Sequence, residues 1–263
     1  MSTDDHAATA DFARPNAARI HDWFLGGTLH TPRDRAAGVA VLDRVPDLRA
    51  LARHNRAFLR HAVHHMLDRG IRHFLDLGAG LPTMGAVHQL ARARQVDATV
   101  VYVDNDAATT TSTTLLLEDT PTAQAVEADL RRPEVLLDRP ELQEVLAQPL
   151  GLLAVDILDT LPDHDRPEAV LRHYIDALAP TSVIALTHVL RWPVPEPGPG
   201  TDPMPLWAVK HPRDRHTLAS WLHGLPPQSR IPTTLDDHAT PDPTSRSPGP
   251  SGYEVAQLLI ATT

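Results

Sequence analysis

The chain has 263 residues, 42% of them apolar, which is enough for a large domain with a buried core. It contains no cysteine, so disulfides, thiolate catalysis and cysteine metal sites are excluded. The formal net charge of -9 and the lack of a long basic run argue against a nucleic-acid partner.

Residues 1–69 are expected to form an N-terminal arm and three helices. The start, MSTDDHAATADF, lacks the layout of a signal peptide, and no apolar run reaches membrane-spanning length. We therefore expect a cytoplasmic protein without a membrane partner. The first helix lies in RPNAARIHDWFLGG, with Pro15 in its first turn, and the second starts at Thr31 and Pro32. The third has apolar residues at helical spacing, with Asp47 as its cap and Gly70 at its end.

After residue 70, short apolar runs alternate with helical segments. The predicted strands are IRHFLDL, ATVVYVDND, TAQAVEADL, LGLLAVDIL and SVIALTHVL. The predicted helices between them are TMGAVHQLARAR, AATTTSTTLLLED, PEVLLDRPELQEVLA and DRPEAVLRHYIDALAP. Such alternation is typical of a parallel sheet with helices on both faces, an α/β fold.

The C-terminal part is less regular. The proline-rich segment 193–205 is predicted to be a loop, because proline is excluded from helix interiors and central strands. A helix in PRDRHTLASWLHGL, an edge strand in SRIPTTL and a final strand in YEVAQLLIAT follow. We expect the last two strands to form a hairpin at one sheet edge, which gives a mostly parallel, seven-stranded sheet.

A glycine turn follows the first predicted strand. Gly78 and Gly80 let a ligand approach the backbone, but the third glycine of a dinucleotide fingerprint is replaced by Thr83. No lysine follows, which excludes a P-loop. Asp76, directly before the turn, would repel a pyrophosphate and would suit a ligand that carries an ammonium or a sulfonium. These features favour S-adenosylmethionine over a dinucleotide.

Aspartates also close the next three predicted strands. Asp104 stands where an acid can accept hydrogen bonds from both ribose hydroxyls. Asp129 can meet the adenine amine, with Leu130 packed on the ring, and Asp156 closes the fourth strand. One such aspartate is more often a helix cap, but four at the edge where open sheets bind ligands favour a binding site.

The sequence resembles the actinobacterial S-adenosylmethionine-dependent methyltransferase family that was long described as a domain of unknown function. The matching stretches, within residues 14–190, are RPNAARIHDWFLGG, DLRALARHNRAFLRHAV, IRHFLDLGAGLPTMGAVHQLA, VVYVDND, EADLRRPE and LLAVDILDTLPDHDRPEAVLRHYIDALAP. The resemblance implies a Rossmann-like class I methyltransferase core, residues 70–263, forming one unit with an N-terminal helical cap. It implies contacts to the methionine part from Asp76, Gly78 and Gly80, to the ribose from Asp104 and Asn105, and to the adenine from Asp129 and Leu130.

Methyl transfer from a sulfonium needs a positioned nucleophile, and a base only where the acceptor loses a proton. Asp156, Asp159 and His188 are the catalytic candidates, since they follow the fourth and fifth strands. A capping role for Asp159 and a hydrogen-bonded core position for His188 are the simpler alternatives. Arg19 and Asp22 are candidates for cap contacts to cofactor or substrate, against the alternative of an exposed ion pair.

Two positions depart from the family pattern: Thr28-Leu29-His30-Thr31 replaces a Lys-Asp-Asn-aromatic run, and Asp159 stands where histidine is frequent. A methyltransferase acting on a small molecule of secondary metabolism is therefore weighed against a non-catalytic S-adenosylmethionine-binding or regulatory module. An NAD-binding oxidoreductase is less favoured. His61 and His65 have metal-ligand spacing but no acidic companion, so no metal is expected. The sequence does not indicate an oligomeric state.

Overall fold

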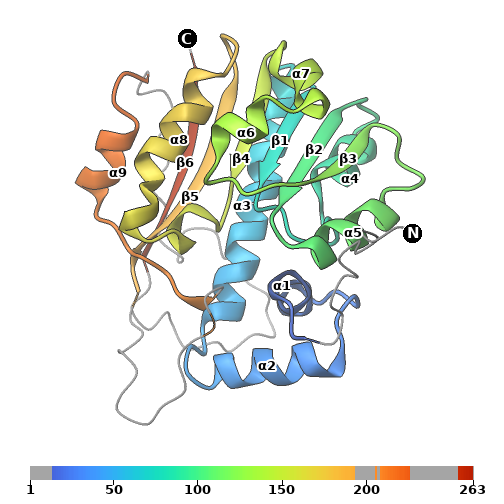
Figure 1. The fold of residues 1–263 in the computed structure, drawn as a ribbon, viewed down its shortest axis with the longest axis vertical. Helices are drawn as coiled ribbons and strands as arrows, with labels where there is room; N and C mark the ends of the chain where they lie inside the picture. The colour runs from blue at the N-terminus through green and yellow to red at the C-terminus, as the bar shows by residue number, and fades with distance from the viewer. Residues whose placement is uncertain (1–13, 193–204, 206–207, 226–253, 263) are drawn as a thin grey trace, which may run out of the picture.

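The structure, a computed structural model, describes residues 14–192, 205, 208–225 and 254–262. Its sheet has six strands in the order β3-β2-β1-β4-β5-β6, and neighbours are parallel except β5 and β6 (Figure 1). Leu77 pairs with Val103, and Asp104 with Glu127, so the strands around the glycine turn end at one edge. The strands are β1 (His73–Leu77), β2 (Thr99–Asp104), β3 (Ala123–Glu127), β4 (Leu150–Ala154), β5 (Val183–Arg191) and β6 (Glu254–Ala261).

Helices cover both faces of the sheet. One buried apolar cluster joins the sheet to α6 (Pro133–Leu137), α7 (Pro140–Leu146), α8 (Pro167–Asp176) and α9 (Arg215–Trp221). A second joins its other face to α3 (Leu48–Asp68) and α4 (Val87–Ala93). Figure 1 shows the first group in front of the sheet and α3 behind it. The expected parallel sheet between two helical layers is thus confirmed.

The N-terminal helices lie beyond the carboxyl edge of the sheet (Figure 1). A third apolar cluster joins α1 (Ala17–Leu25) and α2 (Pro32–Leu42) to the first half of α3 and to Val189 of β5. The second half of α3 packs on the sheet, where Met66 would touch any side chain added at Gly151. One long helix therefore ties the N-terminal helices to the sheet, and the boundary expected at residue 70 stays a prediction.

Local chemistry sets the limits of these helices. Thr31 and Asp34 form a capping box at the predicted start of α2, whereas Asp47 precedes α3 without a side-chain capping bond. Helix α1 begins at Ala17, after Pro15, because Asn16 is its cap and accepts a 3.0 Å hydrogen bond from the Arg19 N–H.

Helix α5 (Ala107–Leu116) forms as predicted despite its poor helix propensity. Asp106 caps it by accepting from the Thr109 N–H at 2.7 Å. Hydroxyls inside it bond to carbonyls four residues earlier, as Thr110 does to Asp106 and Thr114 to Thr110, each at 2.9 Å. The Asp106 cap and the packing of the buried face, which carries Ala108, Thr109, Thr110 and Thr113, outweigh the weak intrinsic preference.

One expectation for the secondary structure differs from what the described residues show, and another falls outside those residues. The single helix expected over 133–147 is wrong, because α6 and α7 are separate; Arg139, before Pro140, is extended at φ −70° and ψ 136°. The predicted strand SRIPTTL and most of segment 193–205 lie outside the described residues, so the seventh strand stays a prediction. Within the described chain β6 pairs with β5.

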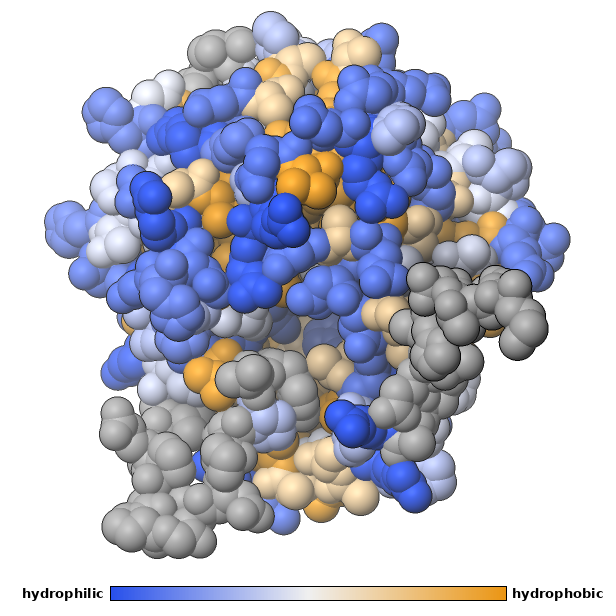
Figure 2. All heavy atoms as spheres, in the orientation of Figure 1, coloured by the Kyte–Doolittle hydropathy of each residue, from blue (hydrophilic) through white to orange (hydrophobic). Residues whose placement is uncertain are grey.

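No helix in the described part of the chain is both long and apolar enough to cross a membrane. The face in Figure 2 is mainly hydrophilic, with apolar residues in small separate groups. Nor do the described residues gather three His, Asp or Glu side chains in a way that could hold a metal ion.

Candidate functional site

A cavity of about 900 Å³ lies at the carboxyl edge of the sheet, between the strand ends, α1 and α3. Eight of the predicted site residues line it: Asp76, Gly78, Gly80, Asp104, Asn105, Asp129, Leu130 and Asp156. Its volume is at the upper end of the roughly 300–1,000 Å³ typical of small-molecule sites. The cavity therefore has room for a cofactor and a second small molecule.

The glycine turn after β1 is shaped by two residues with left-handed backbone. Gly78 has φ 65° and Gly80 has φ 61°, values that side chains disfavour. A Cβ at Gly78 would lie 2.4 Å from Ile157 Cγ1, so this position is also closed by packing. The Gly80 N–H donates to Asp104 Oδ2 at 3.0 Å, which joins the turn to the end of β2. The Asp106 N–H donates to the other oxygen, Oδ1, at 3.0 Å.

Asp76 and Arg56 present opposite charges to the cavity without a hydrogen bond between them. Asp76 is buried at the end of β1, and burial raises its pKa to about 7, with Asp104 adding to the rise and Arg56 opposing it. Arg56 lines the cavity from α3, and burial lowers its pKa while Asp76 and Tyr102 raise it. An acid and a guanidinium on separate walls suit a zwitterionic head group, with ammonium at the first and carboxylate at the second.

At the end of β3, Asp129 is already engaged by a cation. Arg131 Nε donates to Asp129 Oδ1 at 2.9 Å and its Nη2 to Oδ2 at 2.6 Å, and this pairing lowers the pKa of Asp129. Arg131 also reaches Asp165 at 3.3 Å. Leu130 is buried in the cavity wall, and its carbonyl accepts from the Tyr174 hydroxyl at 2.9 Å. An adenine amine at Asp129 would therefore meet a carboxylate that is held in place by Arg131.

Helix α1 is held over the glycine turn by polar contacts. Asn16 Nδ2 donates to Asp106 Oδ1 at 2.7 Å, linking the start of α1 to the start of α5. Asp22 Oδ1 accepts from the Thr83 hydroxyl at 2.6 Å. Ala18 lies 3.5 Å from the Cβ that a side chain at Gly80 would have. The helix thus forms a wall of the cavity.

The two predicted cap contacts, Arg19 and Asp22, do not line the cavity. Arg19 Nε donates to buried Asp34 at 2.8 Å, joining α1 to α2, and Asp22 binds Thr83 and the Leu29 N–H. Burial alone would raise the pKa of Asp34, but its hydrogen bonds lower it to about 2. The helical face turned to the cavity instead carries Ala17, Ala18, His21 and Phe24. Arg19 lies on the side of the helix opposite Ala17 and His21, where it meets α2. Asp22 lies at the edge of the cavity-facing side, where the loop after β1 occupies its carboxylate.

The side chain of Lys210 binds both aspartates that follow β4. Its ammonium donates to Asp156 Oδ1 at 2.7 Å, to the Asp156 carbonyl at 3.2 Å and to Asp159 Oδ1 at 2.8 Å, which uses its three donors. Burial would lower the pKa of Lys210, but the two carboxylates raise it. Burial would raise the pKa of Asp159, but Lys210 holds it below its ordinary value. The three groups form a charge-paired cluster in which Lys210 and Asp159 are buried and Asp156 is partly exposed to the cavity.

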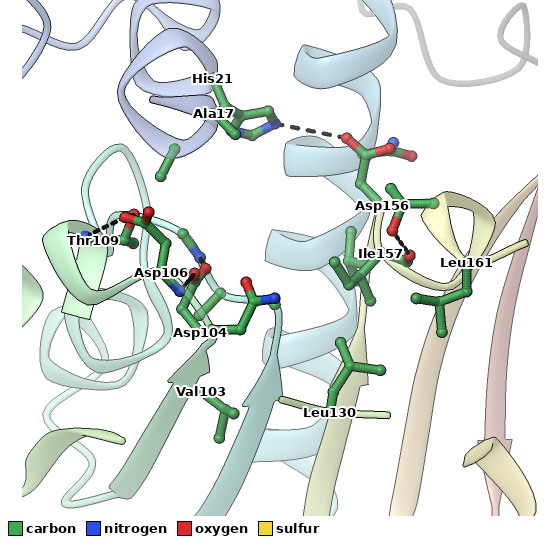
Figure 3. Close-up of a pocket in the computed structure, with 18 of the residues that line it drawn as sticks. Ala17, His21, Val103, Asp104, Asp106, Thr109, Leu130, Asp156, Ile157 and Leu161 are labelled. Carbon is green, nitrogen blue, oxygen red and sulfur yellow. Dashed lines mark hydrogen bonds and ion pairs between the residues drawn. The ribbon is translucent and has the colours of Figure 1, made fainter. Parts of the chain in front are cut away.

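The candidates Asp156 and Asp159 have different surroundings. Asp156 lines the cavity and has φ 63°, a strained value for a residue with a side chain. Its Oδ2 points to His21 Nε2 across 3.8 Å (Figure 3). Asp159 is 1% exposed and lies behind Lys210, and its second oxygen accepts from the Val189 N–H at 3.1 Å. Only Asp156 can meet a ligand directly.

His188 is a hydrogen-bonded core histidine. It is fully buried on β5 and does not line the cavity. Its Nδ1 lies 2.9 Å from the Val189 carbonyl and its Nε2 3.2 Å from the Arg213 guanidinium, so Nδ1 donates and Nε2 accepts. Burial lowers the pKa of His188. Both nitrogens are occupied, so the catalytic role expected for His188 has no geometric support, and the simpler alternative describes its position.

Sequence reasoning missed many cavity residues, among them four whose polar groups bear on the chemistry of the site: His21, Asn55, Arg56 and Lys210. Asn55 and Arg56 interrupt the apolar stripe of α3, which is a signal that a polar surface faces something other than the core. Lys210 is the only lysine in a chain that otherwise uses arginine. His21 had no signal, since sixteen histidines make any single one inconspicuous.

Comparison with known proteins decides the family. A model of the S-adenosyl methyltransferase family matches residues 3–202. The chain belongs to the S-adenosyl methyltransferase family. S-adenosylmethionine is accordingly its cofactor and methyl transfer its reaction class, which confirms the family resemblance in the sequence.

Solved structures similar to this methyltransferase include two actinobacterial proteins. One is a proposed methyltransferase from Thermobifida fusca, 27% identical, with a TM-score of 0.76 over 99% of this chain and 100% of the other. The other, a DUF574 family protein from Streptomyces avermitilis, is 26% identical, with a TM-score of 0.76 over 97% of this chain and 100% of the other.

A more distant likeness supports the fold alone. The 1,6-didemethyltoxoflavin N1-methyltransferase of Burkholderia thailandensis is 15% identical, with a TM-score of 0.51 over 90% of this chain and 92% of its own. No functionally curated protein matches the chain.

Proposed function

We propose that this methyltransferase binds S-adenosylmethionine over β1 to β3 and methylates a small-molecule acceptor held over β4 and β5. The observation that carries the proposal is the cavity itself, in which the glycine turn and the carboxylates at three strand ends lie together. A buried, unbonded Asp76 and a turn that excludes side chains at Gly78 fit a cationic ligand lying against the backbone.

The cofactor contacts follow from these positions. Asp76 would bind the methionyl ammonium and Arg56 its carboxylate, while Gly78 and Gly80 leave room for the chain between them. Asp104 and Asn105 would hold the ribose, and Leu130 would pack on the adenine with Asp129 at its edge. When bound, S-adenosylmethionine supplies an electrophilic methyl group on sulfur. The helices α1 to α3 would act as the cap, with α1 as the wall that shields this group from water.

Asp156 and His21 are the groups placed to handle a proton of the acceptor. Burial and the nearby Arg56 lower the pKa of His21 to about 4, so the imidazole is neutral at pH 7. Lys210 fixes one oxygen of Asp156 and leaves the other toward His21. A nucleophile with an O–H or N–H would hydrogen-bond to Asp156 Oδ2, which orients its lone pair and takes up the proton when the new bond to carbon forms.

Titration calorimetry with S-adenosylhomocysteine and NAD tests the cofactor assignment. The wild-type chain should bind S-adenosylhomocysteine and not NAD, and Asp104→Ala should weaken binding at least tenfold, since a charged hydrogen bond contributes about 1.5–3 kcal/mol. Asp119→Ala, at an exposed position, is the control. Unchanged binding by Asp104→Ala would refute the site. Binding with no methyl turnover on any acceptor tried would instead favour the non-catalytic module.

A further inference from the structure

Asn55 is a buried amide that has no hydrogen-bond partner. It lies on α3, lines the cavity and is 2% exposed. Neither its Oδ1 nor its Nδ2 has a hydrogen-bond partner among the residues that the structure describes. Buried polar groups are nearly always paired, because leaving one unpaired forfeits its bonds to water without replacement. An unpaired amide in a cavity wall therefore indicates that a bound ligand supplies the missing hydrogen-bond partners.

The position of Asn55 on α3 places it on the acceptor side of the cavity. Its neighbour Arg56 lines the cavity, and the charges nearest to it are those of Asp76 on β1 and Tyr102 on β2, with Asp156 contributing less. Asn55 lies about 100° farther round the helix. It is one turn after Leu51, which packs in one cluster with Val189 of β5. Asn55 consequently faces β4 and β5, where Asp156 also lines the cavity.

The surroundings define which acceptor would fit. Lys210 has no donor to spare, and His21 is neutral at pH 7. The nearby cation Arg56 is the proposed partner of the cofactor carboxylate, so with cofactor bound the wall around Asp156 offers little to an anion. The N-terminal helices contribute apolar wall from Phe24, Leu48 and Ala52. These features suit an uncharged molecule with an apolar body.

We propose that Asn55 determines acceptor specificity by binding an amide-like edge, in which an N–H stands beside a C=O as in a lactam or a carboxamide. The inference rests on the proposed function and names its substrate class. The lactam N–H donates to Asn55 Oδ1 and its carbonyl accepts from Nδ2, while the nucleophilic O–H or N–H elsewhere on the molecule donates to Asp156. The terminal amide torsion is soft, so Asn55 turns into the cavity at little cost.

The first test compares stability with cofactor binding in the full chain. In Asn55→Leu the unpaired amide is gone, so the Tm of the ligand-free protein should rise by about 2–4 °C. Affinity for S-adenosylhomocysteine should change less than threefold. His61→Leu, at an exposed position of the same helix, should leave both unchanged. Asn55→Ala serves in place of leucine if the larger side chain does not fit.

The second test uses a matched pair of probes on the complex with S-adenosylhomocysteine. Calorimetry should show 2-quinolone binding at least tenfold more tightly than N-methyl-2-quinolone, which lacks the N–H. The preference should vanish in the Asn55 variant.

The outcomes separate this inference from the proposed function. A lower Tm in both Asn55 variants would show that the amide is structural, and a tenfold loss of S-adenosylhomocysteine affinity would assign it to the cofactor. Equal binding of the two probes, or no binding of 2-quinolone, would also overturn the inference. If the wild-type chain fails to bind S-adenosylhomocysteine, the proposed function itself fails.

Discussion

The hydroxyl of Thr83 donates a 2.6 Å hydrogen bond to Asp22, and this bond ties the loop after β1 to helix α1. Asp22 is 1% exposed, so water cannot replace the donor. Thr83 stands where a dinucleotide fingerprint has its third glycine. Thr83 thus links the loop after the glycine turn to helix α1. Its side chain has a structural role of its own at the place where a dinucleotide site has glycine.

Thr83→Val tests this contact with a side chain of nearly the same shape. We expect the free energy of unfolding to fall by about 1–3 kcal/mol, because a buried carboxylate oxygen loses its partner. Urea unfolding measures the change, and Thr83→Ser, which keeps the hydroxyl, should retain most of the stability. A urea midpoint of Thr83→Val equal to that of the wild type would mean that this hydrogen bond contributes nothing to the free energy of unfolding.

Gly78 and Gly80 should respond differently to alanine. Both would bear the cost of a left-handed residue, about 1–2 kcal/mol. At Gly78 the new methyl also overlaps Ile157, 2.4 Å away, whereas at Gly80 the nearest atom is 3.5 Å away. Ligand-free Gly78→Ala should therefore unfold at lower urea than Gly80→Ala, and Ile157→Ala in the same chain should recover part of the loss. Equal losses would show that Ile157 moves aside freely.

Asp76 should make stability depend on pH. Its folded pKa of about 7 is above the ordinary 3.8, so its contribution is complete below about pH 4 and is lost as pH rises to about 7. The loss is on the order of 4 kcal/mol at most. Asp76→Asn should remove this dependence, which unfolding curves at pH 4, 5.5 and 7 would show. Parallel pH profiles for the two proteins would contradict the raised pKa.

The same group should couple cofactor binding to pH. The methionyl ammonium favours ionised Asp76, so affinity for S-adenosylhomocysteine should increase about tenfold as pH rises from 6 to 8, with most of the increase below pH 7. Asp76→Asn should bind more weakly and with a flat profile. Calorimetry across this range measures both, and a wild-type profile without slope would argue against contact between Asp76 and the ammonium.

Lys210→Met should leave the buried carboxylate of Asp159 and the partly exposed carboxylate of Asp156 without their cation. Breaking a buried ion pair in this way costs about 3–5 kcal/mol. Adding Asp159→Asn should restore part of the stability, because one unpaired charge is removed. If the single variant proves too unstable to purify, refolding yields of the single and double variants make the same comparison. No difference between them would indicate that Asp159 is not coupled to Lys210.

The sequence predicted the sheet and the ligand edge because these depend on local patterns. Alternating apolar runs place Asp76 and Asp104 at neighbouring strand ends whatever the rest of the chain does. Thr31 and Pro32 start α2 for equally local reasons. The single helix expected over 133–147 is wrong because the prediction gave no weight to Pro140. A proline disfavours helical backbone at the residue before it, here Arg139.

The acceptor side could not be predicted because its residues meet only through tertiary packing. Lys210 is 51 residues after Asp159 in the sequence, and the proline-rich segment stands between them. The two residues meet only in the folded chain. Arg19 and Asp22 were expected to face the ligand, yet the rotation of α1, set by its apolar contacts with α2 and α3, turns His21 there. Side-chain direction at a helix over a sheet edge is a property of packing, which one sequence does not encode in any short motif.

The pairing of the only lysine has a practical consequence for chemical labelling. With its amine buried, protonated and bound to three acceptors, Lys210 should resist acylation by amine-directed reagents while the chain is folded. It becomes reactive only when the segment after β4 separates from it. Acylation at this one residue, read by mass spectrometry, would therefore report the opening of the acceptor side of the cavity, free of background from any other lysine in the sequence.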